Sequence, residues 1–251
     1  MLQIITAKTV RIMTYNIHSC IGRDRKLSPF RIAEVIAQCD PDIVALQEVD
    51  VGRTRTQGVD QARAIADHLN MDFHFYPAIK IEEEGYGNAI LSRYPMQLAA
   101  AGQLPTLPSL RPLERRGALR SMIQVGSRTI QIINTHLGLC RRERLLQADA
   151  LLGSDWLTHS TCHPPCIICG DFNAMPGSLV YRRFRKLLLD AQHCLPNHRP
   201  LNTWPTFYPL IRIDHAFISP EIMVRRIETP RTPLTRVASD HLPLVIDIRL
   251  A

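Results

Sequence analysis

Short runs of apolar, mostly β-branched residues recur along the chain, and most of them stop at a polar side chain. Runs of about four to eight such residues are typical of buried strands. The two neighbouring runs 118–125 and 129–135 predict a hairpin that turns at Gly126 and Ser127. We expect strands over 10–15, 43–46, 88–92, 118–125, 129–135, 166–169, 211–218 and 244–248.

Segments with apolar residues at helical spacing lie between several of these strands. Ser28 followed by Pro29 is typical of a helix start, and apolar residues recur from Ile32 to Cys39. Further helices are expected over 62–69, 144–157 and 179–189. Strands that alternate with helices and hairpins indicate a mixed α/β fold in which helices flank the sheets.

The composition allows a large core and indicates a negatively charged partner. Of the 251 residues 45% are hydrophobic, and no repeat or low-complexity segment appears, so we expect one domain over residues 1–251. Thirty Lys and Arg against 23 Asp and Glu give a formal net charge of +7. This excess favours nucleic acid, an acidic lipid surface or a phosphorylated small molecule, although a merely basic protein is the alternative.

The first ten residues and the cysteines bear on location. The segment from Met1 to Val10 has one lysine and no long apolar core, unlike a secretory signal. No apolar run approaches the roughly 20 residues that a membrane-spanning helix needs. Seven cysteines, an odd number, argue against a disulfide framework and favour a reducing cytoplasm. No feature indicates an obligate protein partner, so we expect a monomer.

A zinc site is an alternative for part of the cysteine set. Cys162, Cys166 and Cys169 lie close to His159 and His163 in the sequence. However, the stretch from Cys166 to Cys169 is itself an apolar run, and no second Cys/His pair at zinc-finger spacing follows it. Buried strand cysteines are therefore the favoured interpretation.

Polar side chains at two of the expected strand ends are suited to bind a hard cation. Asn16 ends the run 10–15, and Glu48 follows the run 43–46. Carboxylate and amide oxygens suit Mg²⁺ or Mn²⁺, and such an ion neutralises charge on a phosphoryl group. We expect Glu48 to be the principal metal ligand with Asn16 beside it; the alternative is a surface glutamate.

Other polar residues are suited to proton transfer and phosphate binding. Asp171 and Asn173 share a Gly-Asp-Phe-Asn segment, where they can position a water and contact a phosphate. The alternative is an Asx turn that only bends the backbone. His241, after Asp240, can act as a general base or as a cationic clamp, and Asp214 is the candidate carboxylate that orients it.

These motifs, in this order, resemble the endonuclease/exonuclease/phosphatase superfamily, which includes deoxyribonuclease I, apurinic endonucleases, neutral sphingomyelinases and inositol polyphosphate 5-phosphatases. The resemblance covers the chain from Asn16 to His241. It implies a four-layer α/β sandwich with two central, mostly antiparallel β-sheets and a divalent metal at their common edge. In this resemblance Glu48 would bind the metal, assisted by Asn16 and Asp240.

The resemblance also implies roles in catalysis and substrate binding. Asp171 and Asn173 would position the nucleophile and the phosphate. The remaining candidates are His241, hydrogen-bonded to Asp214, as base or phosphate clamp; His136, as a contact of the scissile phosphate or leaving group; Asn88, as the partner of His136; and Arg116, as a phosphate contact.

Departures from the family's motifs narrow the subgroup. Apurinic endonucleases usually carry Tyr where this chain has His136, and Arg-Leu-Asp-Tyr where it has Arg-Ile-Asp-His at 212–215. Tyrosyl-DNA phosphodiesterases prefer Thr at the position of Phe172. Lys-rich specificity elements of inositol phosphatases are not evident after His136, although arginines offer cationic contacts there. These are Arg141, Arg142 and Arg144.

We therefore expect a phosphodiester hydrolase that depends on Mg²⁺, with Mn²⁺ as a substitute, and that acts as an endonuclease on DNA. The alternative is a phospholipid or sphingomyelin phosphodiesterase, or an inositol-phosphate phosphatase, that uses the same residues. A catalytically silent binding module is disfavoured, because every position that the family needs is filled.

Overall fold

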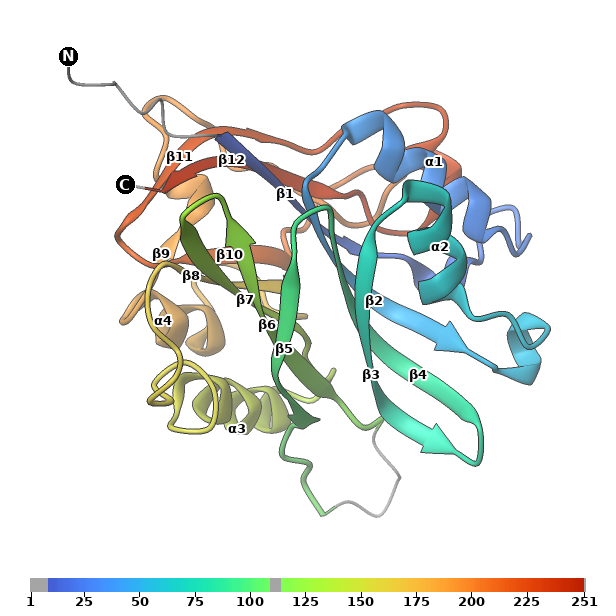
Figure 1. The fold of residues 1–251 in the computed structure, drawn as a ribbon, viewed down its shortest axis with the longest axis horizontal. Helices are drawn as coiled ribbons and strands as arrows, with labels where there is room; N and C mark the ends of the chain where they lie inside the picture. The colour runs from blue at the N-terminus through green and yellow to red at the C-terminus, as the bar shows by residue number, and fades with distance from the viewer. Residues whose placement is uncertain (1–8, 109–113, 251) are drawn as a thin grey trace.

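The computed structural model describes residues 9–108 and 114–250 and contains two six-stranded sheets (Figure 1). The first sheet has the order β11 (Ile222–Glu228), β12 (Leu244–Leu250), β1 (Thr9–Asn16), β2 (Ile43–Val51), β4 (Glu84–Ser92) and β3 (Asp72–Ile81). The second has the order β5 (Met96–Gln103), β6 (Gly117–Val125), β7 (Arg128–His136), β8 (Cys166–Asp171), β10 (Asp214–Ile218) and β9 (Leu189–Asp190). The helices are α1 (Pro29–Cys39), α2 (Gln61–Leu69), α3 (Arg141–Leu152), α4 (Leu179–Arg185) and α5 (Thr235–Ala238).

Both sheets are built on the same plan. In each, the two central strands run parallel and are joined through a helix, as β1–α1–β2 and as β7–α3–β8. The strand pairs outside these two are antiparallel. The expectation of mostly antiparallel sheets is therefore confirmed. Because parallel strands end at one edge of a sheet, each central pair delivers two strand ends to the same place.

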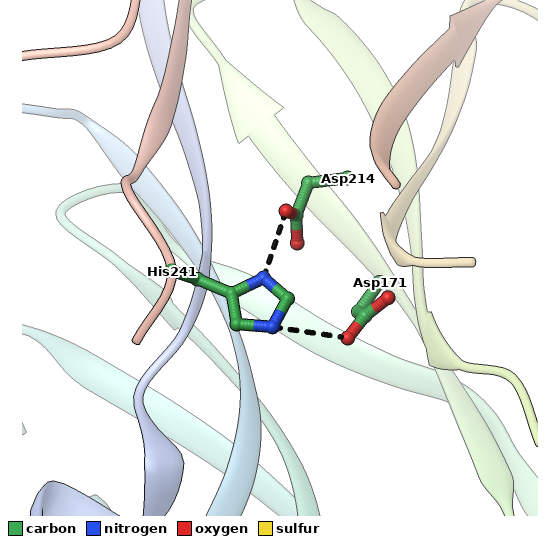
Figure 2. A group of neighbouring side chains, drawn as sticks. All are labelled: Asp171, Asp214 and His241. Atoms are coloured by element: carbon green, nitrogen blue, oxygen red, sulfur yellow. Dashed lines mark hydrogen bonds and ion pairs between the residues drawn. The ribbon is translucent and has the colours of Figure 1, made fainter. Parts of the chain in front are cut away.

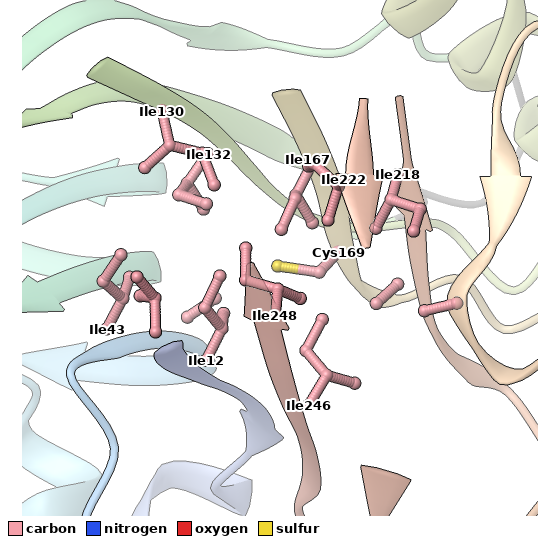
Figure 3. Close-up of a cluster of buried hydrophobic side chains, with 14 of the residues drawn as sticks. Ile12, Ile43, Ile130, Ile132, Ile167, Cys169, Ile218, Ile222, Ile246 and Ile248 are labelled. Atoms are coloured by element: carbon pink, nitrogen blue, oxygen red, sulfur yellow. The ribbon is translucent and has the colours of Figure 1, made fainter. Parts of the chain in front are cut away.

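An apolar core fills the space between the two sheets. Ile12 and Ile43 of the first sheet face Ile132 and Ile167 of the second (Figure 3). All four side chains have at most 1% exposure, and β-branched residues of this kind pack well on a pleated surface. Successive residues of a strand point to opposite faces, so these strands also need apolar cover on their outer sides.

Helices provide that outer cover. Ile36 of α1 and Ile65 of α2 pack with Met13 of β1, while Leu151 of α3 and Phe184 of α4 belong to the core behind the second sheet. The order of layers is helix, sheet, sheet, helix, which confirms the expected four-layer α/β sandwich. None of the helices in residues 9–108 and 114–250 is long and apolar enough to cross a membrane.

Several predicted elements are confirmed. The hairpin of β6 and β7 turns at Gly126 and Ser127. Cys166 and Cys169 are buried in β8, so the interpretation as strand cysteines is confirmed.

Other predicted boundaries are wrong. Helix α3 starts at Arg141 and ends at Leu152 instead of spanning 144–157, because Gly153 follows and glycine ends helices readily. Helix α4 ends at Arg185 rather than at 189, because Leu189 pairs with β10 as part of β9.

The expected strand 211–218 is also shorter in the structure. Ile211 forms an isolated bridge with Trp204, and β10 begins only at Asp214. Sequence patterns did not indicate β3, β5 or β11. Strand β5 is mostly Ala and Gln with intermediate or exposed side chains, so its pairing with β6 rather than its own pattern makes it a strand.

Candidate active site

Strand ends from both sheets meet at one edge and gather most of the predicted site residues. Asn16 ends β1, while His136 and Asp171 end β7 and β8 and lie opposite each other in the sheet register. Asp214 starts β10 directly opposite Asp171, and His241 lies three residues before β12. The sandwich therefore brings together residues that are far apart in the sequence.

Glu48 reaches this edge through a bulge. The pairing of β2 with β4 shifts its register between Leu46 and Val49, and Glu48 between them has a φ of +58°. Strand β2 continues to Val51, so Glu48 lies within the strand and not after its end as predicted. Bulges re-aim side chains. Here the bulge brings Oε1 of Glu48 to 3.0 Å from the Nδ2 of Asn16.

Asn16 connects the two sheets. The same Nδ2 also donates to Oδ2 of Asp171, at 3.1 Å. Its Oδ1 accepts the backbone N–H of His18 at 3.1 Å, which fixes the orientation of the amide. Asn16 is 1% exposed, so this amide joins the carboxylates of Glu48 and Asp171 within the protein interior.

His241 lies between two carboxylates (Figure 2). Its Nδ1 is 2.9 Å from Oδ2 of Asp214, and its Nε2 is 3.6 Å from Oδ2 of Asp171. The hydroxyl of Thr203 also donates to Asp214. Burial alone would lower the pKa of His241, but the charges of Asp214 and Asp171 outweigh it and raise the pKa to about 10. The ring is therefore a cation at neutral pH.

Asp171 is held in a dry turn. The backbone N–H of Asn173 donates to its Oδ1 at 2.8 Å, so the Asx turn considered as an alternative does form. Its Oδ2 still faces Asn16 and His241. Burial raises the pKa of Asp171, against the opposing effect of the His241 charge, which makes it a better proton acceptor than an exposed carboxylate.

His136 is a neutral ring with a defined proton position. Nη1 of Arg116 lies 3.2 Å from its Nδ1, and an arginine can only donate, so the hydrogen of a neutral ring belongs on Nε2. That Nε2 is 3.4 Å from Oδ2 of Asp171, which can accept its hydrogen. It is also 3.0 Å from Nδ2 of Asn173, a second donor, which bonds the carbonyl of Leu137. Burial, and then the Arg116 charge, lower the pKa of His136 well below its usual value.

Asn88 and Arg116 both lie beside His136, but Arg116 rather than Asn88 contacts its ring. Asn88 lies inside β4 and not at a strand end, and its amide donates to the carbonyl of Gly117 at 2.8 Å. Asn88, Arg116 and His136 line one small hollow. Within the described residues His136 contacts Arg116, Asn173 and Asp171, and the expected direct pairing of Asn88 with His136 does not occur.

Asp240 faces side chains that sequence patterns did not indicate. Its Oδ1 is 3.2 Å from Nδ1 of His18, and its Oδ2 accepts from Nε1 of Trp204 at 3.4 Å. Burial would raise the pKa of Asp240, but the bonded His18 and the nearby charges lower it to about 2. His18 lies two residues after Asn16, and this proximity is the one sequence feature that could have indicated it as a site residue. Thr203 gave no such signal.

Two groups of side chains offer ligand atoms for a metal ion. Ligand atoms of Asp171, Asp214 and His241 lie within 4.8 Å of one another. In that trio, however, Oδ2 of Asp214 is already bonded to His241 and Thr203, which suits proton handling better than chelation. Glu48 has no ion-pair partner in the described ranges, and its Oε2 is free of hydrogen bonds there. The open oxygen of Glu48 thus suits a hard divalent cation, whereas Asn16 presents its Nδ2 to this side and keeps its Oδ1 on the backbone N–H of His18.

Buried amides fix the sheets directly behind this group. Nδ2 of Asn134, on β7, donates to the carbonyls of Leu46 and Ala89, both at 2.8 Å. Nε2 of Gln47 donates to Oδ1 of Asn134, also at 2.8 Å. Because neither amide is exposed, these bonds hold the bulge of β2 against the second sheet.

Known proteins are similar to this chain in sequence or in fold. The chain is 27% identical to the uncharacterized protein YbhP of Escherichia coli K12 over 251 residues, 96% of each chain. The human Nocturnin catalytic domain with bound sulfate is similar in structure, with a TM-score of 0.72, 24% identity and coverage of 97% of this chain and 95% of that one.

A mannosyl-6-phosphatase of Bacteroides thetaiotaomicron is similar as well, with a TM-score of 0.74, 19% identity and coverage of 95% and 99%. The model of the Endonuclease/Exonuclease/phosphatase family matches residues 13–241. The chain therefore belongs to the endonuclease/exonuclease/phosphatase family, whose members hydrolyse phosphoesters.

Proposed function

We propose that this protein is a divalent-metal-dependent phosphodiesterase that cleaves DNA. The observation that carries the proposal is the position of the Asp171 carboxylate. Its Oδ2 lies 3.1 Å from the amide that holds Glu48 and 3.6 Å from the His241 imidazole. A carboxylate so placed adjoins both the Glu48 carboxylate, a candidate cation ligand, and a fixed positive charge, which suits the hydrolysis of a phosphodiester.

Glu48 would hold the cation, with Mg²⁺ as the natural choice and Mn²⁺ as a substitute. Asn16 would join it only by turning its Oδ1 from the backbone N–H of His18 toward Glu48. When bound, the ion neutralises charge on the phosphoryl oxygens and on the leaving oxygen. Asp171 takes a proton from the attacking water, since its burial favours the protonated form. The oxygen of that water forms the new bond to phosphorus as the bond to the leaving oxygen breaks.

The two histidines have different tasks in this scheme. His241 stays charged through Asp214 and stabilises the negative charge that develops on the phosphoryl group. His136 is neutral, and its Nε2–H and the neighbouring Nδ2 of Asn173 are both donors that would bind a phosphate oxygen. Arg116 keeps that proton on Nε2 through its contact with Nδ1 at 3.2 Å.

Surface features beside the site favour a nucleic acid as the substrate. The net charge of +7 attracts a polyanion. Phe207 and Tyr208 are 70% and 65% exposed, and Arg23 stacks over the Phe207 ring at 5.1 Å. They belong to the loop that Thr206 anchors to the carbonyl of Asp240 at 2.8 Å. Exposed aromatic rings with a stacked arginine suit nucleobases.

A substrate panel tests the proposal. Supercoiled plasmid DNA with Mg²⁺ should be nicked, and a chelator should stop the reaction. The same panel contains sphingomyelin, inositol phosphates and mannose 6-phosphate, the last suggested by the name of the Bacteroides neighbour. The variants Glu48→Gln and His241→Ala should lose the nicking activity while keeping the fold by circular dichroism. Intact plasmid together with phosphate or headgroup release from another substrate would contradict the DNA assignment.

A further inference from the structure

A cavity lined by arginines lies next to the candidate active site, on the side of the second sheet. Its volume is about 300 Å³. The side chains that enclose it come from the first turns of α3 and α4 and from the loop before α4. They are Arg141, Arg144, Gly177, Ser178, Leu179, Val180 and Arg182.

The topology places this cavity beside the phosphate-facing residues. Strand β7 ends at His136 and leads into α3, and the parallel strand β8 ends at Asp171 and leads into α4. Both helices therefore start at the edge of the sheet that carries the site. Nδ2 of Asn173 donates to the carbonyl of Leu137 at 2.9 Å, and Nη1 of Arg144 donates to that of Gly138, the next residue, at 3.1 Å.

The charge of the cavity is not balanced by the chain. In the part of the protein that the structure describes, no acidic side chain pairs with Arg141, Arg144 or Arg182, and none lines the cavity. The neighbouring Arg183, by contrast, forms an ion pair with Asp149. The Nε of Arg144 is buried and has no hydrogen-bond partner.

Isolated surface arginines are usually only solvated, so their number alone would decide nothing. Three arginines around one cavity are a different case from isolated ones, because their mutual repulsion is relieved when an anion enters. Guanidinium groups are also well suited to phosphate oxygens, since they donate two parallel hydrogen bonds.

We infer that this cavity binds the phosphate next to the scissile one along a nucleic-acid strand. The inference rests on the proposed function, because it takes His136, Asn173 and Asp171 as the scissile-phosphate site. A substrate with a single phosphate would leave the cavity unused. The enzyme would thereby select a polynucleotide over a small phosphodiester or a phosphomonoester, through Arg141 and Arg182 in particular.

The first test compares two double variants. Arg141→Ala/Arg182→Ala removes the cavity arginines, whereas Arg128→Ala/Arg225→Ala removes two exposed arginines elsewhere. Arg128 starts β7 and is thus roughly 25 Å from the end of that strand. Anisotropy of a fluorescent DNA duplex is measured with chelator present, so that binding is read without turnover. We expect the cavity variant to bind at least about tenfold more weakly and the control variant less than threefold.

The salt dependence of the same binding gives a second reading. The slope of log K against log salt should fall by about one for the cavity variant, as one phosphate contact is lost. Equal losses of affinity in the two double variants would overturn the inference, since they would indicate only diffuse attraction. A larger loss of binding to anionic vesicles than to DNA in the cavity variant would overturn it as well.

Turnover separates this inference from the proposed function. Bis(4-nitrophenyl) phosphate carries one phosphate, so with Mn²⁺ the cavity variant should hydrolyse it within twofold of the unsubstituted protein, yet lose about tenfold in kcat/KM on an oligonucleotide. A second oligonucleotide carries a neutral methylphosphonate in place of one phosphate beside the cleavage site. The unsubstituted protein should lose about tenfold in kcat/KM on it, and the cavity variant should cleave it no more slowly than it cleaves the unmodified oligonucleotide. Independent, additive losses would overturn the subsite. Absence of metal-dependent turnover on every substrate would instead overturn the proposed function, while the binding comparison would still decide the subsite.

Discussion

The two parallel strand pairs have the same topology but deliver their carboxylates by different means. In the first sheet, Glu48 itself occupies the left-handed position, with a φ of +58° inside a bulge. In the second, Gly170 takes the unusual conformation, with a φ of +143°, and the following Asp171 ends the strand in a regular position. Glu48 is half-buried and free of ion pairs within the described residues, whereas Asp171 is 2% exposed and bonded on both oxygens.

This difference matches the chemistry proposed for each side. A cation ligand benefits from an open oxygen, and the bulge provides one at the expense of a strained backbone. A proton acceptor benefits from burial, which brings its pKa closer to neutral, and the glycine allows β8 to press against β7. One half of the sandwich therefore supplies the metal side of the site and the other half the proton and phosphate side.

Removal of the buried carboxylate should have the largest effect. Asp171→Asn keeps the shape of the side chain but cannot accept a proton, so kcat should fall by about 10³- to 10⁴-fold. The thermal midpoint should fall as well, because the neutral amide no longer balances the buried charge of His241. The loss of kcat is therefore compared at a temperature where the variant is folded. Steady-state kinetics on plasmid or on bis(4-nitrophenyl) phosphate measures this loss. A variant that keeps a tenth of the activity would refute the role given to Asp171.

The second largest effect is expected for Gly170, the residue before Asp171, and it concerns stability. A Cβ on residue 170 would lie 1.8 Å from the carbonyl oxygen of Thr135, so the backbones of β7 and β8 would have to separate. We expect Gly170→Ala to lower the free energy of unfolding by about 3 kcal/mol or more. Gly126→Ala is the matched control, since φ there is +61° but nothing lies within 4 Å. Denaturant titration should give it a loss of only about 1 kcal/mol.

The pKa of His215 measures how well the second strand pair, β7 and β8, is shielded from water. It is opposite Gly170 in the sheet register, and burial followed by the Arg212 charge lowers its pKa to about 4. Between its unfolded pKa of about 6.5 and that value, only the unfolded chain takes up the proton. Stability should therefore fall by up to about 3 kcal/mol as the pH drops through this window. Denaturant titrations from pH 7 to 4 should show that the free energy of unfolding falls less steeply with pH in His215→Phe than in the unsubstituted protein.

The smallest effect concerns the strained position in the first pair. Glu48→Gly should raise the free energy of unfolding by about 1 kcal/mol, because glycine adopts the left-handed conformation without strain. Glu48→Ala keeps the strain and should give no such gain. Both variants should be inactive. A Glu48→Gly protein that is no more stable than Glu48→Ala would show that the bulge carries no strain.

Sequence patterns were sufficient for the mixed α/β class and for most of the residues that meet at the site, whereas the four layers followed from the family resemblance. Apolar runs located the central strands, and the polar residues at their ends, Asn16, His136 and Asp171, do lie together. Those runs are buried on both faces, which gives a strong signal. Edge strands such as β5 have weak patterns of their own and depend on their neighbours.

The parts of the site that escaped prediction depend on tertiary contacts. The bulge at Glu48 is set by how β2 pairs with β4, which no local motif specifies. Thr203 contacts Asp214 across a loop, and His18 contacts Asp240 at the other end of the chain. Sequence alone does not specify such pairings, because each is created only when the two sheets pack.

The division between the two halves is tested most directly by calorimetric titration of Mn²⁺ into three proteins: the unsubstituted chain, Glu48→Gln and Asp171→Asn. We predict that Glu48→Gln loses metal binding together with turnover. Asp171→Asn should bind Mn²⁺ within about threefold of the unsubstituted protein although its turnover is lost. Loss of metal binding in Asp171→Asn alone would place the metal on the second sheet, and equal loss in both variants would place it between the two sheets; either result would contradict the division.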